Sequence, residues 1–200
     1  MSPFAIPPKE LVLPSPLQHI AEDILSCLEN EIYYCALCTA LTIPEICSGL
    51  AMELSEFVKK GHYENFVREY VSEYIGVSEK YVYALRGGII HRGSAIGHNK
   101  IPYGQIVMTI DDWPNPKFHG LYVDNTTDIL AGFDQQGSRV IISLQALCHA
   151  MIKGLENWYK VEWSNPIVIS GLSRMLKFDE EGISTNYTGR SMYFGKKNIS

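Results

Sequence analysis

The chain lacks long apolar runs, and nowhere do about 18 apolar residues follow one another, so the sequence predicts no membrane-spanning helix. The first residues hold no basic region followed by an apolar stretch, so we expect no secretory signal. Cysteine is scarce, with five in 200 residues, and most lie in stretches with helical spacing. Because a disulfide scaffold carries an even number spread through loops, we expect reduced thiols and a cytoplasmic protein.

Common cofactor and metal motifs are also missing. The sequence has no G-x-x-x-x-G-K-[ST], no G-x-G-x-x-G and no G-x-S-x-G. Cys35 and Cys38 have the spacing of a redox or zinc motif, but no second pair follows at zinc spacing. The adjacent Asp111 and Asp112 stand before Trp-Pro, which is typical of a solvated turn. We therefore expect no cofactor and no metal.

The composition is that of an ordinary globular domain, with 46% apolar and 20% charged residues. Seventeen basic and 22 acidic residues give a net charge of −5. A protein that coats nucleic acid usually carries a basic excess, so this balance argues against that class and leaves room only for a local basic site.

Apolar residues recur at helical spacing in several segments. Between the first two, residues 42–45 (TIPE) have the form of a capping box, and Pro44 is tolerated in a first helical turn, so we expect a new helix to start there. The pattern predicts helices over 17–41, 43–57, 63–75, 78–92 and 143–160, with a short one over 169–176.

The remaining segments have other signatures. Prolines in the first 16 residues predict an extended arm, and the last 24 residues, rich in Gly, Ser and Asn, predict a loose tail. Short β-branched runs separated by turn signals predict a small antiparallel sheet. The predicted fold class is therefore α+β and predominantly α-helical. Its parts are an arm (1–16), one domain (17–176) with a β insertion at about 104–142 (strands 105–111, 121–123, 129–133 and 139–142), and a tail (177–200).

Arg86 and His91, in the stretch LRGGIIHRG, are the residues with the clearest chemistry. A guanidinium binds phosphate bidentately, and a histidine transfers protons near neutral pH, so the pair suffices for metal-independent RNA cleavage. On one regular helix the two side chains stand about 140° and about 7.5 Å apart. We expect poor convergence unless the long arginine, loosening at the adjacent Gly87 and Gly88, or a second copy of the chain brings them together.

Residues 42–47 (TIPEIC) followed by residues 83–93 (YALRGGIIHRG) resemble the HEPN superfamily (higher eukaryotes and prokaryotes nucleotide-binding), in particular small HEPN-like proteins of bacteria, phages and plasmids. The resemblance covers roughly residues 17–93 and extends to the helix after Ser143. It implies a HEPN-like helical bundle in which Arg86 and His91 form the R-x4-H catalytic pair. In many active members a polar residue follows the arginine, whereas this chain has Gly87.

The resemblance also implies a function. We expect an endoribonuclease of a toxin or anti-phage system that leaves 2′,3′-cyclic phosphate and 5′-hydroxyl ends, acts as a homodimer and has an antitoxin partner. The alternative is a non-catalytic HEPN-like module for nucleotide or RNA binding or for dimerisation. In a purely structural interpretation, Arg86 forms a surface ion pair and His91 is favoured by the negative end of its helix.

Three further residues are supporting candidates, each with a structural alternative. Glu45 is either a capping-box carboxylate or a residue that orients Arg86 or His91. Arg92 adds positive charge that suits RNA but equally suits a helix end. His98 is either a substrate contact or an exposed loop histidine.

Overall fold

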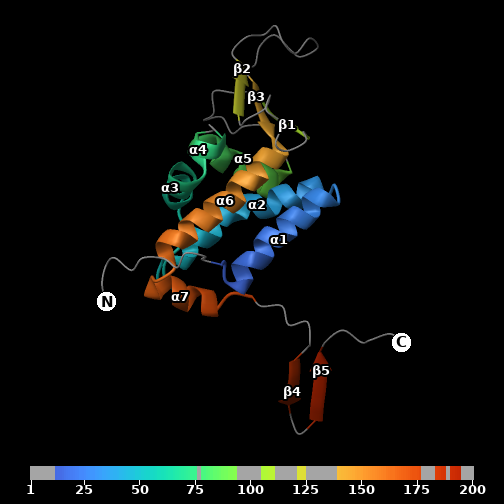
Figure 1. The fold of residues 1–200 in the computed structure, drawn as a ribbon, viewed down its shortest axis with the longest axis vertical. Helices are drawn as coiled ribbons and strands as arrows, with labels where there is room; N and C mark the ends of the chain where they lie inside the picture. Colours follow the sequence, from blue (N-terminus) through green and yellow to red (C-terminus); the bar gives the residue numbers. More distant parts are fainter. Residues whose placement is uncertain are drawn as a thin grey trace.

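The residues that the structure describes are mostly helical, as the sequence predicts, with a small sheet (Figure 1). The computed structural model describes residues 12–75, 78–93, 105–110, 121–124, 139–176, 183–187 and 190–194. Their helices are α1 (Ser15–Glu29), α2 (Tyr33–Leu50), α3 (Lys60–Tyr70), α4 (Ser72–Ile75), α5 (Glu79–Arg92), α6 (Leu144–Glu162) and α7 (Pro166–Ser173). Their strands are β1 (Gln105–Thr109), β2 (Leu121–Asp124), β3 (Arg139–Ser143), β4 (Ile183–Tyr187) and β5 (Arg190–Phe194).

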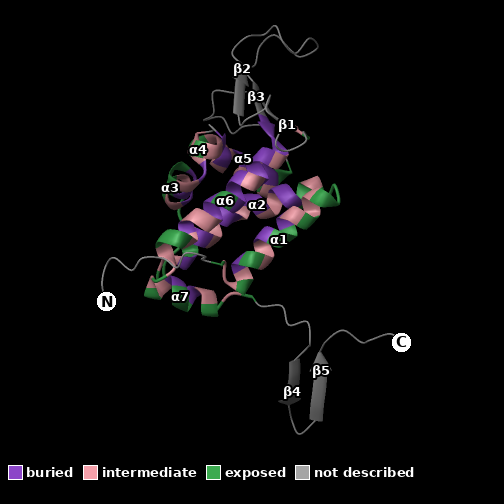
Figure 2. Cartoon of the chain, viewed as in Figure 1, coloured by how far each residue is buried: buried purple, intermediate pink, exposed green. Residues whose placement is uncertain are grey.

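Helix α2 is the centre of the helical body. It contacts α1, α3, α5, α6 and α7, with α6 lying along it (Figure 1). A helix with neighbours on several sides has to be apolar around most of its circumference, and α2 is. Buried residues accordingly gather where α2 and α6 meet, whereas exposed residues lie on the outer helix faces (Figure 2). The buried residues of α2 are Ala36, Leu37, Ala40, Leu41, Ile43, Pro44, Cys47 and Leu50.

The helix predicted over 17–41 is wrong, because the chain turns after Glu29 and α2 begins at Tyr33. The turn has the hydrogen bonds of a Schellman motif: the amide of Glu31 donates to the carbonyl of Leu28 (3.1 Å), and that of Ile32 donates to Cys27 (2.7 Å). Glu31 takes the left-handed conformation, with φ 59°. Glycine usually fills this position, so the sequence carries no stop signal here.

The capping box predicted at residues 42–45 is also wrong, since α2 continues through Pro44 to Leu50. A proline inside a helix lacks the amide that would bond four residues back. Two neighbouring hydroxyls bond to backbone carbonyls near this point: Thr42 donates to Thr39 (2.7 Å), and Tyr63 of α3 donates to Leu41 (3.0 Å). Pro44 is buried inside α2, and the helix continues in spite of the missing hydrogen bond. Glu45 therefore stands in the middle of a helix.

The inserted sheet is mixed rather than purely antiparallel, which corrects the prediction. β3 lies between the other two strands, parallel to β1 and antiparallel to β2. At the end of β3, the Ser143 hydroxyl accepts a hydrogen bond from the amide of Ala146 (3.2 Å) and caps α6, as the sequence predicts. The strand predicted over 129–133 lies outside the described residues.

The two ends of the chain also differ from the prediction. Helix α1 begins at Ser15 with Pro16 in its first turn, so it takes in the last two residues assigned to the arm, of which 1–11 lie outside the described residues. In the segment predicted as a loose tail, β4 and β5 form an antiparallel hairpin. Among the residues that the structure describes, every helix is too short or too polar to cross a bilayer.

Candidate functional site

Three helices place the candidate residues together. Helix α5 packs against α2 and α3 through Val82, Leu85 and Ile89, which are buried and recur at helical spacing. Arg86 follows Leu85 directly and is therefore turned toward the edge of this packed face, while His91 is exposed near the end of the helix. The core contacts of α5 thus fix where the two polar side chains stand.

Arg86 and His91 meet although they belong to one continuous helix. The Nη1 atom of Arg86 lies 3.0 Å from Nε2 of His91. The two side chains therefore converge by the first of the expected routes, in which the long arginine reaches around the helix surface. A guanidinium can only donate, so Nε2 of His91 accepts this hydrogen bond and carries a lone pair rather than a proton.

Glu45 of α2 forms an ion pair with the other terminal nitrogen, Nη2, of Arg86. Of the two interpretations of Glu45, the capping box is absent and the contact with Arg86 is present. The Arg86 side chain is 17% exposed and that of Glu45 is 41% exposed, so the pair lies at the edge of the protein interior. The Nε atom of Arg86 is buried and has no hydrogen-bond partner among the described residues.

An aromatic pair that the sequence analysis missed stands beside these residues. The ring centroids of Tyr63 and Tyr83 are 5.4 Å apart, in an edge-on arrangement with 70° between the planes. Burial raises the pKa of the Tyr63 hydroxyl far above its usual value; the Arg86 charge opposes this shift, while Glu45 and then Tyr83 add to it. The tyrosine therefore stays neutral and keeps the proton that it donates to α2.

Lys60 places a second positive charge over the ring of Tyr83. The Nζ atom of Lys60 lies 5.6 Å from the ring centroid of Tyr83 and 3.4 Å from Oε1 of Glu64. One signal for Tyr83 was available in the sequence: it stands three residues before Arg86, a spacing that puts both on one side of a helix. Tyr63 and Lys60 come from another helix, so only the tertiary packing could show them.

The other two supporting candidates differ in what can be said of them. Arg92 is the exposed last residue of α5, where the negative end of the helix favours a cation. The helix stops at Gly93, which is left-handed with φ 60°, and the hydroxyl of Tyr34 in α2 donates to the carbonyl of Ile89 (3.2 Å). His98 lies outside the described residues.

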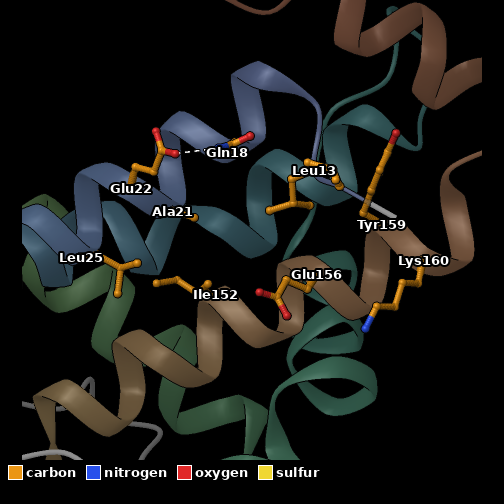
Figure 3. Close-up of a pocket in the computed structure, with 10 residues that line it drawn as sticks. Leu13, Gln18, Ala21, Glu22, Leu25, Ile152, Glu156, Tyr159 and Lys160 are labelled. Carbon is orange, nitrogen blue, oxygen red and sulfur yellow. Dashed lines mark hydrogen bonds between the residues drawn. The ribbon is translucent and has the colours of Figure 1, made fainter. Parts of the chain in front are cut away.

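A groove of about 410 Å³ lies elsewhere, between α1 and α6 (Figure 3). Its wall includes the apolar side chains of Leu25 and Ile152, with Glu22 and Glu156 among its polar groups. Arg86, His91 and Glu45 do not line it. Within the described ranges, no three His, Cys, Asp or Glu side chains come together as ligands of a metal ion would.

Comparison with known proteins finds no relative of this chain. No family model matches the chain, and neither a curated protein nor a solved structure resembles it significantly. The function therefore has to be argued from the Arg86, His91 and Glu45 cluster itself.

Proposed function

We propose that the protein is a metal-independent endoribonuclease of HEPN type, with Arg86 and His91 as its catalytic pair. The observation that carries this proposal is the 3.0 Å contact between Nη1 of Arg86 and Nε2 of His91 at the edge of α5. RNA cleavage needs stabilisation of the charge that develops on the phosphoryl group, and it needs transfer of a proton. Arg86 would supply the first and His91 the second, and the two side chains lie in contact.

In the proposed reaction His91 acts as general base. Its Nε2 takes the proton of a ribose 2′-hydroxyl, the O2′ atom bonds to phosphorus, and the P–O5′ bond breaks. The departing 5′ oxygen takes a proton from water, which leaves a 2′,3′-cyclic phosphate and a 5′-hydroxyl. Arg86 stabilises the negative charge that develops on the phosphoryl oxygens.

Substrate has to exchange contacts in order to enter. Nη1 of Arg86 is bonded to His91 and Nη2 is paired with Glu45. When a phosphate oxygen takes the place of His91 at Nη1, the lone pair of the imidazole becomes available to the 2′-hydroxyl. Glu45 meanwhile holds Nη2, so the guanidinium keeps its orientation and Glu45 serves as a positioning residue.

We extend the proposal to the partners that the HEPN resemblance implies: a homodimer formed through α5, and an antitoxin in a toxin or anti-phage system. Light scattering at micromolar protein concentration tests the homodimer, because a monomer would remove the shared cleft that such a dimer forms. The antitoxin remains a proposal from resemblance alone.

The decisive experiment incubates the purified protein with total RNA in the presence of EDTA, beside His91→Ala. Loss of the general base should slow cleavage by about 10²- to 10⁴-fold. His91 is exposed, so the thermal midpoint should stay that of the wild type. Arg86→Lys should lose most activity as well, because the charge remains but one ammonium cannot hold Glu45 and a phosphate oxygen in the fixed geometry of the two guanidinium nitrogens. Equal cleavage by all three proteins would contradict the proposal.

A second function, that of a non-catalytic HEPN-like module for nucleotide or RNA binding or for dimerisation, is favoured by one observation. Arg86 is 17% exposed and both of its terminal nitrogens are already engaged, an arrangement that also suits a structural ion pair. Glu45→Gln separates the two functions. In the enzyme it should lower kcat more than it lowers stability, whereas in a non-catalytic module, where the Arg86–Glu45 pair is structural, it should lower the denaturation midpoint alone.

A further inference from the structure

Two thiols lie on one face of α2, close to its start. Cys35 is the third residue of the helix and is exposed, and Cys38, three residues later, is half-buried. Three steps along a helix place the two Cα atoms about 5 Å apart. Disulfides join Cα atoms that are roughly 4.4–6.8 Å apart, so the helix backbone already sets this pair at a suitable separation.

The first turn of α2 is able to adjust to a closed pair. A disulfide brings its two Cβ atoms to about 3.8 Å, closer than the about 5–6 Å between neighbouring Cβ atoms on a helix, so the turn has to tighten. The first amides of a helix have no partner within it, and Ile32, the residue before α2, provides no side-chain cap. Few hydrogen bonds therefore oppose a movement of Cys35.

Tyr34 connects the half-buried thiol with α5. Its hydroxyl donates to the carbonyl of Ile89 (3.2 Å) and is also hydrogen-bonded to the thiol of Cys38. The hydroxyl has a single proton, which Ile89 receives, so the thiol is the donor in the second bond. Burial raises the pKa of the Cys38 thiol, which favours this protonated donor. Cys38 is thus held in place beside the exposed Cys35.

We propose that Cys35 and Cys38 are a redox-active dithiol, which closes to a disulfide by exchange with a low-molecular-weight disulfide and acts on the end of α5 through Tyr34. The remaining cysteines are less suited to this chemistry, because those at positions 47 and 148 are buried and the one at position 27 is half-buried.

In the exchange Cys35 reacts first, because it is the exposed thiol. Its thiolate bonds to one sulfur of the small disulfide, the S–S bond breaks, and the other half leaves and takes up a proton. Cys38 then releases its proton to solvent, bonds to the sulfur of Cys35 and expels the second half of the small molecule, which is protonated in turn. Each protein sulfur is oxidised by one electron, and the small disulfide is reduced to two thiols.

Closure changes the contacts of Tyr34. A disulfide sulfur has no hydrogen to donate, so the bond from Cys38 to the tyrosine hydroxyl is lost, and the tightened turn moves Tyr34 away from α5. The carbonyl of Ile89 lies in the last turn of α5, two residues before His91. Oxidation should therefore loosen this helix end. That it also slows RNA cleavage rests on the proposed function.

The first measurement locates the disulfide. The reduced full-length protein is incubated with bis(2-hydroxyethyl) disulfide, a neutral probe chosen because Glu29 and Glu31 stand shortly before Cys35 in the chain. Remaining thiols are alkylated and mapped by mass spectrometry. The wild type should lose the thiols of Cys35 and Cys38. Cys38→Ser should stop at a mixed disulfide on Cys35, and Cys35→Ser should react about tenfold more slowly.

Cys27→Ser is the matched control. Cys27 of α1 interacts electrostatically with the buried Cys148 of α6, so these two form a second pair of neighbouring thiols. The variant should form the Cys35–Cys38 disulfide at the wild-type rate. A wild-type disulfide between Cys27 and Cys148 instead, a mixed disulfide that persists on Cys35, or a bond from Cys35 to a second chain would overturn the proposal.

The second measurement follows amide hydrogen exchange in the last turn of α5. Oxidation should speed exchange there severalfold while exchange in the middle of α6 stays unchanged, and dithiothreitol should reverse the effect. Unchanged exchange in the oxidised protein would overturn the action on α5. Neither measurement uses RNA, so a protein that forms the disulfide but cleaves no RNA would refute the proposed function and support this inference.

Discussion

Gly154 in α6 and Gly87 in α5 are the same residue in the same local structure, yet their surroundings are opposite. A Cβ on Gly154 would lie 2.7 Å from Cγ2 of Val71 and 3.2 Å from the carbonyl oxygen of Tyr70. A Cβ on Gly87 meets no described atom within 4 Å. The first glycine lets α6 approach the chain between α3 and α4, whereas no described residue packs against the second.

The regions around Gly154 and Gly87 therefore differ in how far their stability depends on the glycine. Around Gly154 the backbone segments are so close that any side chain would have to displace a neighbour, so stability depends on the glycine. Around Gly87 no contact with a described residue opposes a larger side chain, so the described packing does not account for the glycine. Substitutions at these two positions should therefore change stability in opposite directions.

The largest expected effect is that of Gly154→Val. The new side chain would overfill the contact with Val71 and Tyr70 and should lower the free energy of unfolding by about 3 kcal/mol, the upper part of the range for overpacked cores. Urea denaturation measures the change. Gly87→Ala is the control and should raise the free energy of unfolding by about 0.5–1 kcal/mol. A valine at position 154 without loss of stability would mean that α6 does not approach this closely.

Tyr63→Phe tests the hydrogen bond between α3 and α2. Its hydroxyl donates to the carbonyl of Leu41, so its loss should lower the free energy of unfolding by about 1–2 kcal/mol, the range for a buried group left without its partner. The matched control is Tyr83→Phe, because no hydrogen bond of the Tyr83 hydroxyl is found among the described residues. Equal stabilities of the two variants would show that the bond to α2 contributes nothing.

The sequence predicts the helices of both regions best where caps are local. The predicted helices over 78–92 and 143–160 differ from α5 and α6 by at most two residues at either end. Ser143 accepts from the amide of Ala146, and Gly93 ends α5 in the left-handed conformation, so short-range chemistry determines these boundaries. The boundary near Glu31 was missed because a glutamate and not a glycine takes the left-handed position there, and the boundary predicted at Pro44 is absent because α2 continues through it.

The residues of the candidate site also differ in whether the sequence predicts them. Arg86 and His91 stand out by residue chemistry and spacing alone, and the predicted contact of Glu45 was one of two alternatives that only packing could separate. Tyr63 and Lys60 lie on α3 and reach the site through the contact between α3 and α5. No sequence spacing places them there, and whether a glycine such as Gly87 faces open space is a property of the tertiary structure.

Helices α1 and α5 differ in the residue that follows them, which gives a smaller effect. A left-handed glutamate, Glu31, lies just beyond the end of α1, and a left-handed glycine, Gly93, lies just beyond the end of α5. Glu31→Gly removes the steric strain of a side chain at positive φ and should raise the free energy of unfolding by about 1 kcal/mol, measured by urea denaturation. The control is Gly93→Ala, which should lower it by a similar amount. A less stable Glu31→Gly would mean that the glutamate side chain contributes more than its strain.

The smallest effect concerns His149, which stands half-buried in α6, the packed region. Burial lowers the pKa of its imidazole in the folded chain. In the unfolded chain the ring titrates near its ordinary value of about 6.5, so below that pH the unfolded state binds more protons than the folded state does. Protonation therefore favours unfolding, and this contribution to stability is complete above that pH and declines as the pH falls through it toward the folded pKa.

His149→Gln removes the titration while it keeps a polar side chain at this position. The free energy of unfolding of both proteins is measured by urea denaturation from about pH 8 to about pH 5, a window that contains the unfolded pKa. The wild type should lose more stability than His149→Gln as the pH falls, so the difference between them should change with pH. Other titrating groups are shared by the two proteins and cancel in that difference. A difference that stays constant across the window would show that the ring titrates alike in the folded and unfolded chains, and that α6 does not bury it.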